Sequence, residues 1–297
     1  MDDSSSVNSQ LRKDTEILIK ADYAEKEDAE LSELLDFVDK RVRQKAQFEL
    51  AKRGSRGLKI FQANLAENKG QMAKVHSIWG IGQLARSGEA NAGQLLVPLL
   101  EDADPEIRAQ AARWLGDIRH KEAEAKLIPL LQDESARVQF FAAEALGRIE
   151  AVSAVQPIVT FLEANNDEDI YLRHAGSLAL ARIGNVAAVI ALYQHPSKAV
   201  RIAAVVALRR MQAEEIAVFL EDKEEYILAE VARAINDDFS IEGALPALGK
   251  VLRRENLTSE PLLRRAINAN LRVGNEEALN QVLRFISMES APENMRI

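Results

Sequence analysis

Aspartate and arginine recur along the sequence at a spacing of six residues. Both members are present in Asp102 with Arg108 and in Asp167 with Arg173, and Arg201 and Arg264 fill the arginine position alone. A carboxylate and a guanidinium can form a bidentate ion pair, which either clamps a charged ligand or ties structural units together. Because the spacing repeats along the chain, we favour a structural ladder between repeats, in which the aspartate also caps a helix.

A second set of basic residues recurs near the ends of predicted helices. The set consists of Lys52, Arg86, Arg148, Arg182 and Arg210. Cations at these positions suit the negative end of a helix dipole. The alternative is an anion-binding or acid-binding stripe along one edge of the protein, so the four arginines form a candidate partner surface.

Two asparagines, Asn268 and Asn270, stand where other repeats carry alanine or another small residue. A buried amide requires hydrogen-bond partners. One interpretation is an inter-repeat hydrogen bond, and the other is a polar contact with a neighbouring domain. Both asparagines are therefore added to the candidate partner surface.

The sequence offers little support for a metal site. The chain has no cysteine, and its four histidines, His76, His120, His174 and His195, include no pair with the i, i+4 spacing of a helical zinc motif. Segment 164–171, ANNDEDIY, is rich in oxygen ligands but lacks the order of a known calcium loop. We interpret this segment as a helix-capping turn or a contact loop, and His76 as a hydrogen-bonded interior residue.

Catalytic motifs are also missing from the sequence. It contains no nucleophile elbow, phosphate-binding loop or dinucleotide fingerprint. Gly80 and Gly82 imitate part of a fingerprint, but they lie on a predicted helix with no strand before it, which indicates packing glycines. Trp79 and Trp114 are expected in the core. We therefore predict no catalytic residue, no cofactor and no metal in this chain, and no enzymatic activity of its own.

One internal repeat positions all of these residues. An apolar anchor is followed four residues later by a small residue and eight residues later by Leu or Ile, which makes one stripe of an α-helix. The anchors, 27 to 36 residues apart, are Val42, His76, Ile107, Val138, Leu172, Val200, Ile227 and Leu263. The residues at the eighth position run from Leu50 to Leu271.

A shorter apolar helix precedes most anchors, and turn residues such as EDADPE join the two helices. Such a helical hairpin cannot bury its apolar face alone, so copies are expected to stack into a solenoid. We predict an all-α protein with an N-terminal extension over residues 1–30, partly helical. About eight hairpins would follow within residues 31–297.

Composition limits the classes of partner. The 297 residues are 47% hydrophobic and 28% charged, with a net charge of −8. A net acidic chain argues against general binding to nucleic acid, and no apolar run is long enough to cross a membrane. The expected partners are other proteins or neighbouring domains of the same polypeptide.

The segments PLLEDADPEIRAQAARWLGDI and PLLQDESARVQFFAAEALGRI resemble HEAT-like repeats of the phycobilisome-lyase type. The resemblance covers about residues 31–297 and implies a right-handed, armadillo-like superhelix. Because such repeats serve many roles, it implies little about function.

A narrower similarity rests on an ordered series that includes VRQKAQFELAKRG, NNDEDIYLRHAGSLALARIG and LLRRAINANLRVG. The series resembles the repeat region of exported bacterial proteins called membrane-bound or sorbosone-type dehydrogenases. In that family a β-propeller precedes the repeats and a c-type haem domain follows them. The resemblance implies a periplasmic or exported scaffold within a redox protein, although the composition fits the cytoplasm equally.

Two other functions remain open at this stage. One is that of a bilin lyase-like protein that binds an open-chain tetrapyrrole, as the repeat type suggests. The other is nucleic-acid binding, as in some HEAT-repeat proteins, which the net charge opposes.

The last residues, APENMRI, look like the beginning of a further second helix that stops early. We therefore expect an incomplete ninth repeat, with Leu279, Leu283 and Ile286 partly uncovered. On this interpretation Ile297 is a boundary within a longer protein.

Overall fold

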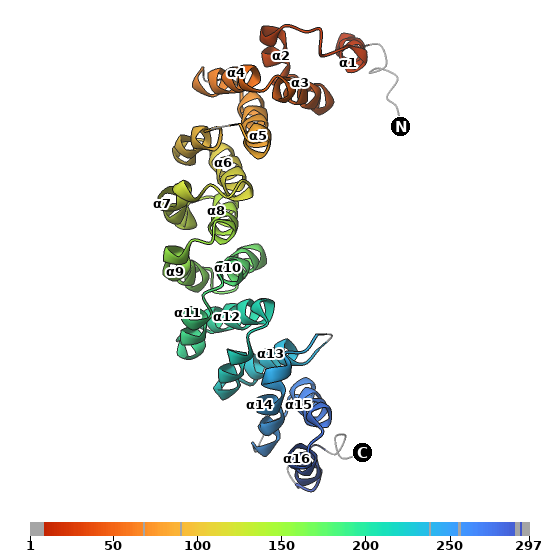
Figure 1. Cartoon of the computed structure of the whole chain (residues 1–297), viewed down its shortest axis with the longest axis vertical. Helices are drawn as coiled ribbons and strands as arrows, with labels where there is room; N and C mark the ends of the chain where they lie inside the picture. The colour runs from red at the N-terminus through yellow and green to blue at the C-terminus, as the bar shows by residue number, and fades with distance from the viewer. Residues whose placement is uncertain are drawn as a thin grey trace. The chain divides into compact units, whose positions relative to one another are not determined.

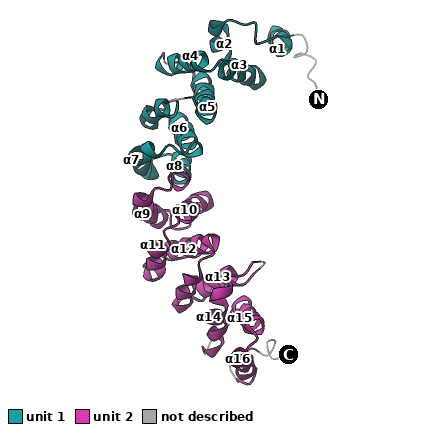
Figure 2. Cartoon of the chain, viewed as in Figure 1, with its two compact units in different colours: residues 1–145 teal, residues 146–297 magenta. Residues whose placement is uncertain are grey.

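The computed structural model describes residues 9–67, 69–89, 91–237, 239–254, 257–288 and 292. These residues are almost entirely helical, and the one β interaction among them is an isolated antiparallel bridge between Asn236 and Ser240. The chain forms two compact units, Met1–Ala145 and Leu146–Ile297 (Figures 1 and 2). None of the described helices has the length and apolar character needed to cross a bilayer.

The first unit contains a single helix, α1 (Gln10–Lys20), followed by helical hairpins. The hairpins pair α2 (Asp28–Leu34) with α3 (Lys40–Lys52), α4 (Ser55–Ala66) with α5 (Gln71–Arg86), and η1 (Gly93–Glu101) with α6 (Pro105–Asp117). The next hairpin joins η2 (Lys121–Ala123), α7 (Glu124–Leu127) and η3 (Ile128–Gln132) to α8 (Ala136–Arg148), and the unit boundary falls inside α8.

The second unit continues the same pattern. Its hairpins pair η4 (Val152–Ala154) and α9 (Val155–Asn165) with α10 (Ile170–Ile183), α11 (Val186–Ile190) and η5 (Ala191–Gln194) with α12 (Lys198–Met211), and η6 (Glu214–Glu221) with α13 (Glu225–Ile235). The last hairpin pairs η7 (Glu242–Ala244), α14 (Leu245–Lys250) and η8 (Val251–Arg253) with α15 (Glu260–Val273). A further helix, α16 (Glu276–Ile286), follows it.

The described elements thus confirm an all-α protein of eight helical hairpins, which stack on one another within each unit. We call the two members of each hairpin its first and second helix. α16 has the place of a ninth first helix, and its Leu279 and Leu283 are exposed as expected. The expected second helix of that repeat falls mostly on residues outside the described ranges. The extension boundary near residue 31 stays a prediction, and α2 begins at Asp28.

Turn residues determine where the second helices begin. The side chains of Asp39, Asp104, Asp169 and Ser197 each accept a hydrogen bond from a backbone N–H of the helix that follows. Each bond satisfies one of the four amides that an α-helix leaves unpaired at its start. The caps thereby fix the phase at which each second helix presents its apolar stripe.

The apolar stripes form the core of each unit. The anchors Val42, Ile107, Val138, Val200 and Ile227 are fully buried, as the repeat predicts. Small residues in the stripes allow close approach: a Cβ on Gly80 would lie 2.2 Å from the Phe61 ring, and one on Gly82 would lie 2.1 Å from the Trp114 ring. Both glycines are therefore packing glycines.

The two tryptophans differ from the prediction, because both are only half-buried. The indole N–H of Trp79 donates to Gln110 Oε1 at 2.8 Å, and the Trp114 ring lies beneath the Arg86 guanidinium at 4.8 Å. An indole carries a polar N–H, and the position of Trp79 at the edge of the core lets that group find a partner. The buried Nε1 of Trp114 has no hydrogen-bond partner among the described residues.

The predicted register is wrong in the last hairpin. In α15 the buried residues include Leu262, Ala266 and Asn270, whereas Leu271 is exposed. The anchor is therefore Leu262 rather than Leu263, and Asn270 takes the position that Leu fills in other repeats. Two adjacent leucines made both phases compatible with an apolar stripe.

The core assignment predicts different costs for two substitutions in the second unit. Leu180 is fully buried, so Leu180→Ala should lower the free energy of unfolding by about 2–5 kcal/mol. Arg210 is exposed, so Arg210→Ala should change it by less than about 0.5 kcal/mol. Urea denaturation followed by circular dichroism measures both, and the reverse order of costs would contradict the helical phase.

Candidate interaction surface

The residue after each anchor reaches back to the turn between the two helices. Arg43, Arg108, Gln139 and Arg201 each donate from the side chain to the backbone carbonyl six residues earlier, at 2.6 to 2.9 Å. In four hairpins this bond ties the second helix to its own turn. It satisfies a carbonyl that no helix or sheet pairs.

Two of these arginines also join successive repeats. Arg108 Nε and Nη2 donate to the two oxygens of Asp133 at 2.8 Å each, and Arg201 Nε donates to Asp222 at 2.7 Å. Each aspartate belongs to the next repeat. Its other hydrogen bond holds its own turn, because Asp133 and Asp222 accept from the amides of Ser135 and Glu224 at 2.9 Å. These contacts have the geometry of the predicted ladder.

The other residues proposed for the ladder lie differently. Asp102 contributes its carbonyl to Arg108, while its carboxylate lies 3.7 Å from Lys74 of the preceding repeat. Arg173 contacts Asp167 of its own turn at 3.8 Å. The next repeat carries His195 and Pro196 at its turn, so it offers Arg173 no carboxylate there.

The assignment of Arg264 to the ladder is wrong. Its exposed side chain pairs with Glu260 of the same helix at 2.6 Å. The cause is the register of α15, because an anchor at Leu262 moves Arg264 one position away from the ladder. Arg265 does not take over the role either, since it contacts Asp237 of the preceding repeat.

The Arg108–Asp133 pair is held in a partly desolvated place. Burial, the strongest influence on Asp133, raises the pKa of its carboxyl, but the hydrogen bonds from Arg108 and from the Ser135 amide together lower it. The ionised pair is therefore favoured in the folded protein. Its donors and acceptors are used within the repeats, so it is not available as a ligand clamp.

The ladder predicts a large effect at Arg108. Arg108→Ala would leave a carboxylate that is only 7% exposed without its partner, which should cost about 2–4 kcal/mol of unfolding free energy. Arg137→Ala is the matched control, because the side chains of Arg137 and its partner Glu106 are 54% and 30% exposed, so the pair should contribute only about 0–1 kcal/mol. Equal, small losses in chemical denaturation would show that the ladder does not stabilise the fold.

His76 lies in a buried chain of polar contacts between α3 and α5. Arg43 Nε donates to His76 Nε2 at 3.1 Å, so the other ring nitrogen carries the proton and donates to Gln47 Oε1 at 2.8 Å. Gln47 in turn donates to Gln83 at 2.9 Å. This arrangement agrees with the interpretation of His76 as a hydrogen-bonded interior residue.

The surroundings of His76 oppose its protonation. Burial of the ring, followed by the nearby charge of Arg43, lowers the pKa of His76 to about 4 from an ordinary value of 6.5. The unfolded chain therefore takes up a proton below pH 6.5, while the folded chain does so only near pH 4. The stabilisation of the folded protein by neutral His76 is fully present above pH 6.5 and is lost as the pH decreases towards 4.

We expect the folded protein to lose about 3 kcal/mol between pH 6.5 and 4 through His76. His76→Asn should remove that part of the pH dependence, whereas the exposed His174→Asn should leave it unchanged. Denaturation curves over this pH range test the difference. A pKa near 6.5 for the His76 ring in an NMR titration of the folded protein would contradict the assignment.

The contacts of the remaining histidines and of the acidic insertion at residues 164–171 are separate from one another. His195 Nδ1 accepts from the Ser197 amide at 3.2 Å, and His120 lies 3.2 Å from Gln94. In the insertion, Asn165 bonds the backbone of Asp169, which caps α10. The described residues contain no group of three or more His, Cys, Asp and Glu side chains that could hold a metal ion.

The basic set near the helix ends is partly neutralised by the protein itself. Arg86 lies 3.3 Å from Asp117, which has the same position in the next repeat. Arg148 and Arg182 are half-buried, and Arg210 is exposed. The row is therefore interrupted by acidic residues and does not form a continuous cationic stripe.

Both candidate asparagines make internal hydrogen bonds. Asn268 Oδ1 accepts from Asn236 of the preceding repeat at 3.0 Å. Asn270 is buried and donates to the carbonyls of Gly249 and Ala266 at 3.0 and 2.9 Å. These contacts favour the structural interpretation of both residues.

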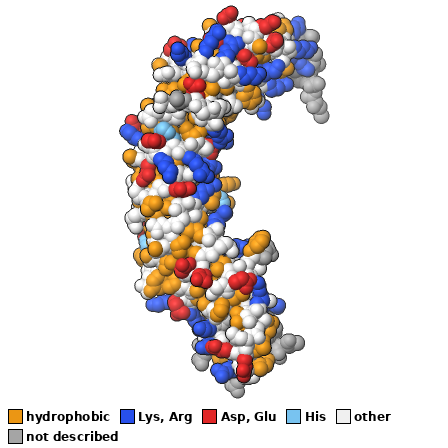
Figure 3. All heavy atoms as spheres, viewed as in Figure 1, with side chains coloured by type: hydrophobic (Ala, Val, Ile, Leu, Met, Phe, Trp, Pro, Cys, Tyr) orange, Lys and Arg blue, Asp and Glu red, His pale blue; other side chains and the backbone are white. Residues whose placement is uncertain are grey.

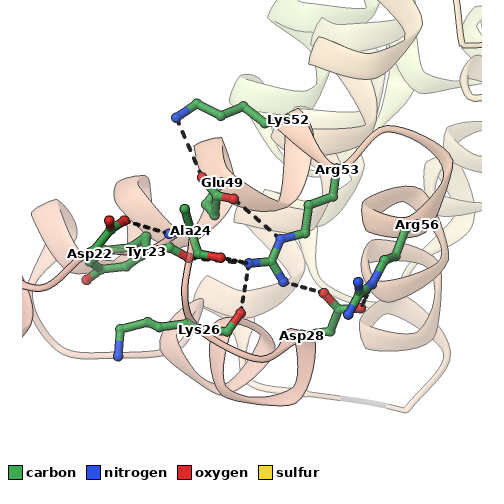
Figure 4. A network of polar contacts seen from close by, with 9 residues as sticks. All are labelled: Asp22, Tyr23, Ala24, Lys26, Asp28, Glu49, Lys52, Arg53 and Arg56. Atoms are coloured by element: carbon green, nitrogen blue, oxygen red, sulfur yellow. Dashed lines mark hydrogen bonds and ion pairs between the residues drawn. The ribbon is translucent and has the colours of Figure 1, made fainter.

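Sequence reasoning missed a polar network around Arg53, at the end of α3 (Figure 4). Arg53 pairs with Asp28 at 2.5 Å and with Glu49 at 3.4 Å, and it donates to the carbonyls of Tyr23, Ala24 and Lys26. The network fastens the segment before α2 to the first hairpin. A signal existed, because four later repeats carry an apolar residue at this position: Ile118, Ile149, Ile183 and Met211.

Charge is distributed unequally between the two rows of helices. Second helix α3 has five basic residues and one acidic residue, and α12 has four basic residues and no acidic one. First helices α2 and η6 each have three acidic residues and no basic one. Lys and Arg side chains accordingly gather over α3 in the space-filling view (Figure 3). The exposed face of these second helices is basic although the chain is acidic.

Comparison with known proteins agrees with the fold. Residues 93–170 match the family model of HEAT repeats. The Escherichia coli protein YibA has a similar structure, with a TM-score of 0.50, 17% identity and coverage of 88% of this chain and 96% of that one. At this identity the likeness concerns the fold alone.

Two further structures are similar at lower scores. The complex of CpcE and CpcF of phycocyanin lyase from Nostoc gives a TM-score of 0.43 and 20% identity, over 82% of this chain and 93% of that one. An engineered protein gives a TM-score of 0.42 and 19% identity, over 90% and 88% of the two chains. No curated protein matches the chain in sequence.

Proposed function

We propose that the chain is a non-catalytic scaffold that binds proteins or neighbouring domains through the exposed face of its second helices. The charge distribution carries this proposal. The ladder arginines Arg108 and Arg201 are used inside the repeats, whereas Lys198 and Arg210 are exposed on α12. Arg41 and Lys52 are also exposed, although each pairs with an acidic residue nearby. Exposed cations on a rigid helical face provide charge complementarity for a partner and guide its orientation.

The wider setting is part of the same proposal. The ordered series of segments similar to the repeat region of exported dehydrogenases supports a role as a spacer between redox domains. It also supports a periplasmic or exported location. In such a protein the scaffold would hold two domains at a fixed separation, and the redox chemistry would belong to those domains.

Cross-linking in the complete protein tests the proposal. Amine-reactive cross-links from flanking domains or co-purified partners should reach the second-helix lysines Lys52 and Lys198. Links to the exposed first-helix lysines Lys126 and Lys250 should be rarer, which makes them the matched controls. Cross-links concentrated on the first helices would contradict the proposed face. Sustained reduction of an electron acceptor by the repurified chain alone would contradict a non-catalytic role.

A further inference from the structure

The second helices of the first unit expose basic side chains rather than acidic ones. The exposed cations among their described residues are Lys40, Arg41, Lys45, Lys52, Arg86, Arg113 and Arg137. The acidic residues of the same helices, all of them half-buried or buried, are Glu49, Glu106, Asp117 and Glu144. A partner that approaches this face therefore meets mainly cations, although the whole chain has a net charge of −8.

The excess of positive charge is largest on α3. On the helices that follow, Arg86 and Arg113 lie 3.3 and 3.9 Å from Asp117, and Arg137 lies 2.8 Å from Glu106. α3 itself has five basic residues and one acidic residue. Lys and Arg side chains gather over it in Figure 3. Charge complementarity for an anionic partner is therefore stronger on α3 than on α6 or α8.

Two carboxylates pair with cations of α3 without neutralising the helix. Asp39 accepts hydrogen bonds from Nε and Nη2 of Arg41 at 3.0 and 2.7 Å. Glu49 lies 3.5 Å from Lys52 and 3.4 Å from Arg53, and its side chain is 12% exposed, against 76% for Lys52. Lys52 therefore shares its carboxylate with a second cation and remains accessible to an anion from outside.

Two other lysines of α3, Lys40 and Lys45, have no ion pair with a described residue. The Lys45 ammonium donates to the Ile19 carbonyl at 2.5 Å and lies 5.2 Å from the ring centre of Tyr23. A carbonyl and a ring hold the side chain in place without cancelling its charge. α3 thus presents three lysines whose charge is available to a partner.

Phe48 lies among these cations on the same face of α3. Arg41, Lys45, Phe48 and Lys52 follow one another at intervals of four, three and four residues, which is the spacing of one helical face. The Phe48 side chain is 47% exposed. Exposed aromatic residues are enriched at the centres of protein interfaces. The face therefore offers apolar contact and positive charge together.

A cavity of about 700 Å³ adjoins the beginning of this face, between α1 and the turn before α3. Arg41 belongs both to the lining of the cavity and to the face. The apolar part of the lining includes Leu11, Ile19 and Val38, of which Leu11 is 51% and Val38 is 65% exposed. Apolar side chains around a hollow provide a place for an apolar side chain of a partner.

The charged residues of the cavity nearly balance one another. Glu16 pairs with Lys20, and Asp39 pairs with Arg41. Arg12 is the remaining cation of the lining. The cavity therefore favours an apolar group, and the preference for an anion comes from the lysines of α3.

The size of the basic face limits what can bind there. From Lys40 to Lys52 the helix rises about 18 Å, because each residue adds about 1.5 Å. That length matches about five or six residues of an extended peptide. α2, the first helix of the same hairpin, has three acidic residues and no basic one. A long polyanion such as nucleic acid would extend past the face, where the chain is acidic, whereas a short acidic segment fits within it.

We propose that the exposed face of α3, together with the adjoining cavity, binds a short acidic segment of a partner protein that also carries an apolar residue. Carboxylates of the segment would accept hydrogen bonds from Lys40, Lys45 and Lys52. The apolar side chain would pack on Phe48 or enter the cavity. The inference rests on the proposed interaction face and adds the position of the site and the chemistry of the partner.

Fluorescence anisotropy with a labelled peptide of Glu-Glu-Leu repeats tests the site in the full chain at low salt. The peptide should bind, its affinity should fall as salt is added, and a peptide of Gln-Gln-Leu repeats should bind much more weakly. A carbodiimide joins a lysine amine to a carboxylate in contact with it. This reagent should link the acidic peptide to Lys40 or Lys52 and not to the exposed Lys59 of α4.

Matched substitutions separate this face from exposed charge in general. Lys52→Glu should weaken binding by about tenfold or more, because it places a like charge opposite the segment. Lys59→Glu makes the same change of charge on a first helix of the same unit, so it should leave the affinity unchanged. Phe48→Ala should also weaken binding, whereas Phe48→Tyr, which keeps the ring, should retain it. Circular dichroism confirms that each variant is folded.

Three outcomes would overturn the site. They are equal affinity for the two peptides, equal effects of Lys52→Glu and Lys59→Glu in folded variants, and no binding of the acidic peptide. Binding of a labelled oligonucleotide that Lys52→Glu abolishes, without peptide binding, would assign the face to phosphate instead. If peptide binding fails while cross-links in the complete protein still reach Lys198, the proposed function stands and this inference is wrong.

Discussion

The structure depends on the burial of one apolar stripe on each second helix against its neighbours. Leu146, Leu180 and Leu208 are fully buried in this way, although none of their hairpins could form such a core alone. Close approach is possible because the middle of the stripe is small, as at Ala142 and Ala204. The turns, caps and ion pairs keep the apolar stripes of successive second helices aligned with one another.

This constraint divides the polar residues into two groups. The polar residues at the turns, such as Arg108 and Asp133, form hydrogen bonds that hold one repeat to the next. On the exposed face of the second helices some cations also pair with the neighbouring repeat, as Arg86 does with Asp117, whereas the side chain of Arg210 is exposed. The same separation explains how an acidic chain can present a basic face. The acidic residues concentrate on first helices such as α2 and η6.

Much of the fold could be predicted from the sequence, because the repeat carries its signal many times. Eight hairpins, the anchors of all but the last and the role of the packing glycines follow from residue spacing alone. The phase of α15 could not be decided, since Leu262 and Leu263 both continue an apolar stripe. Its error carried over to Arg264, which the structure places outside the ladder.

The candidate site was harder to predict for a physical reason. Arg209, Arg233 and Arg265 lie 3.3 to 3.9 Å from the carboxylate of Asp237. This arrangement depends on the distance between neighbouring helices, which spacing along the chain does not specify. The Arg53 network could have been found, because arginine replaces an apolar residue at a repeated position.

A double-mutant cycle on Arg108 and Asp133 tests the central claim most directly, namely that the repeated charges are structural and leave function to the exposed face. The account predicts that the two alanine substitutions together cost less than the sum of their separate costs, with a coupling of about 1–3 kcal/mol in unfolding free energy. A coupling near zero would contradict it, because the two charges would then be free to bind a ligand.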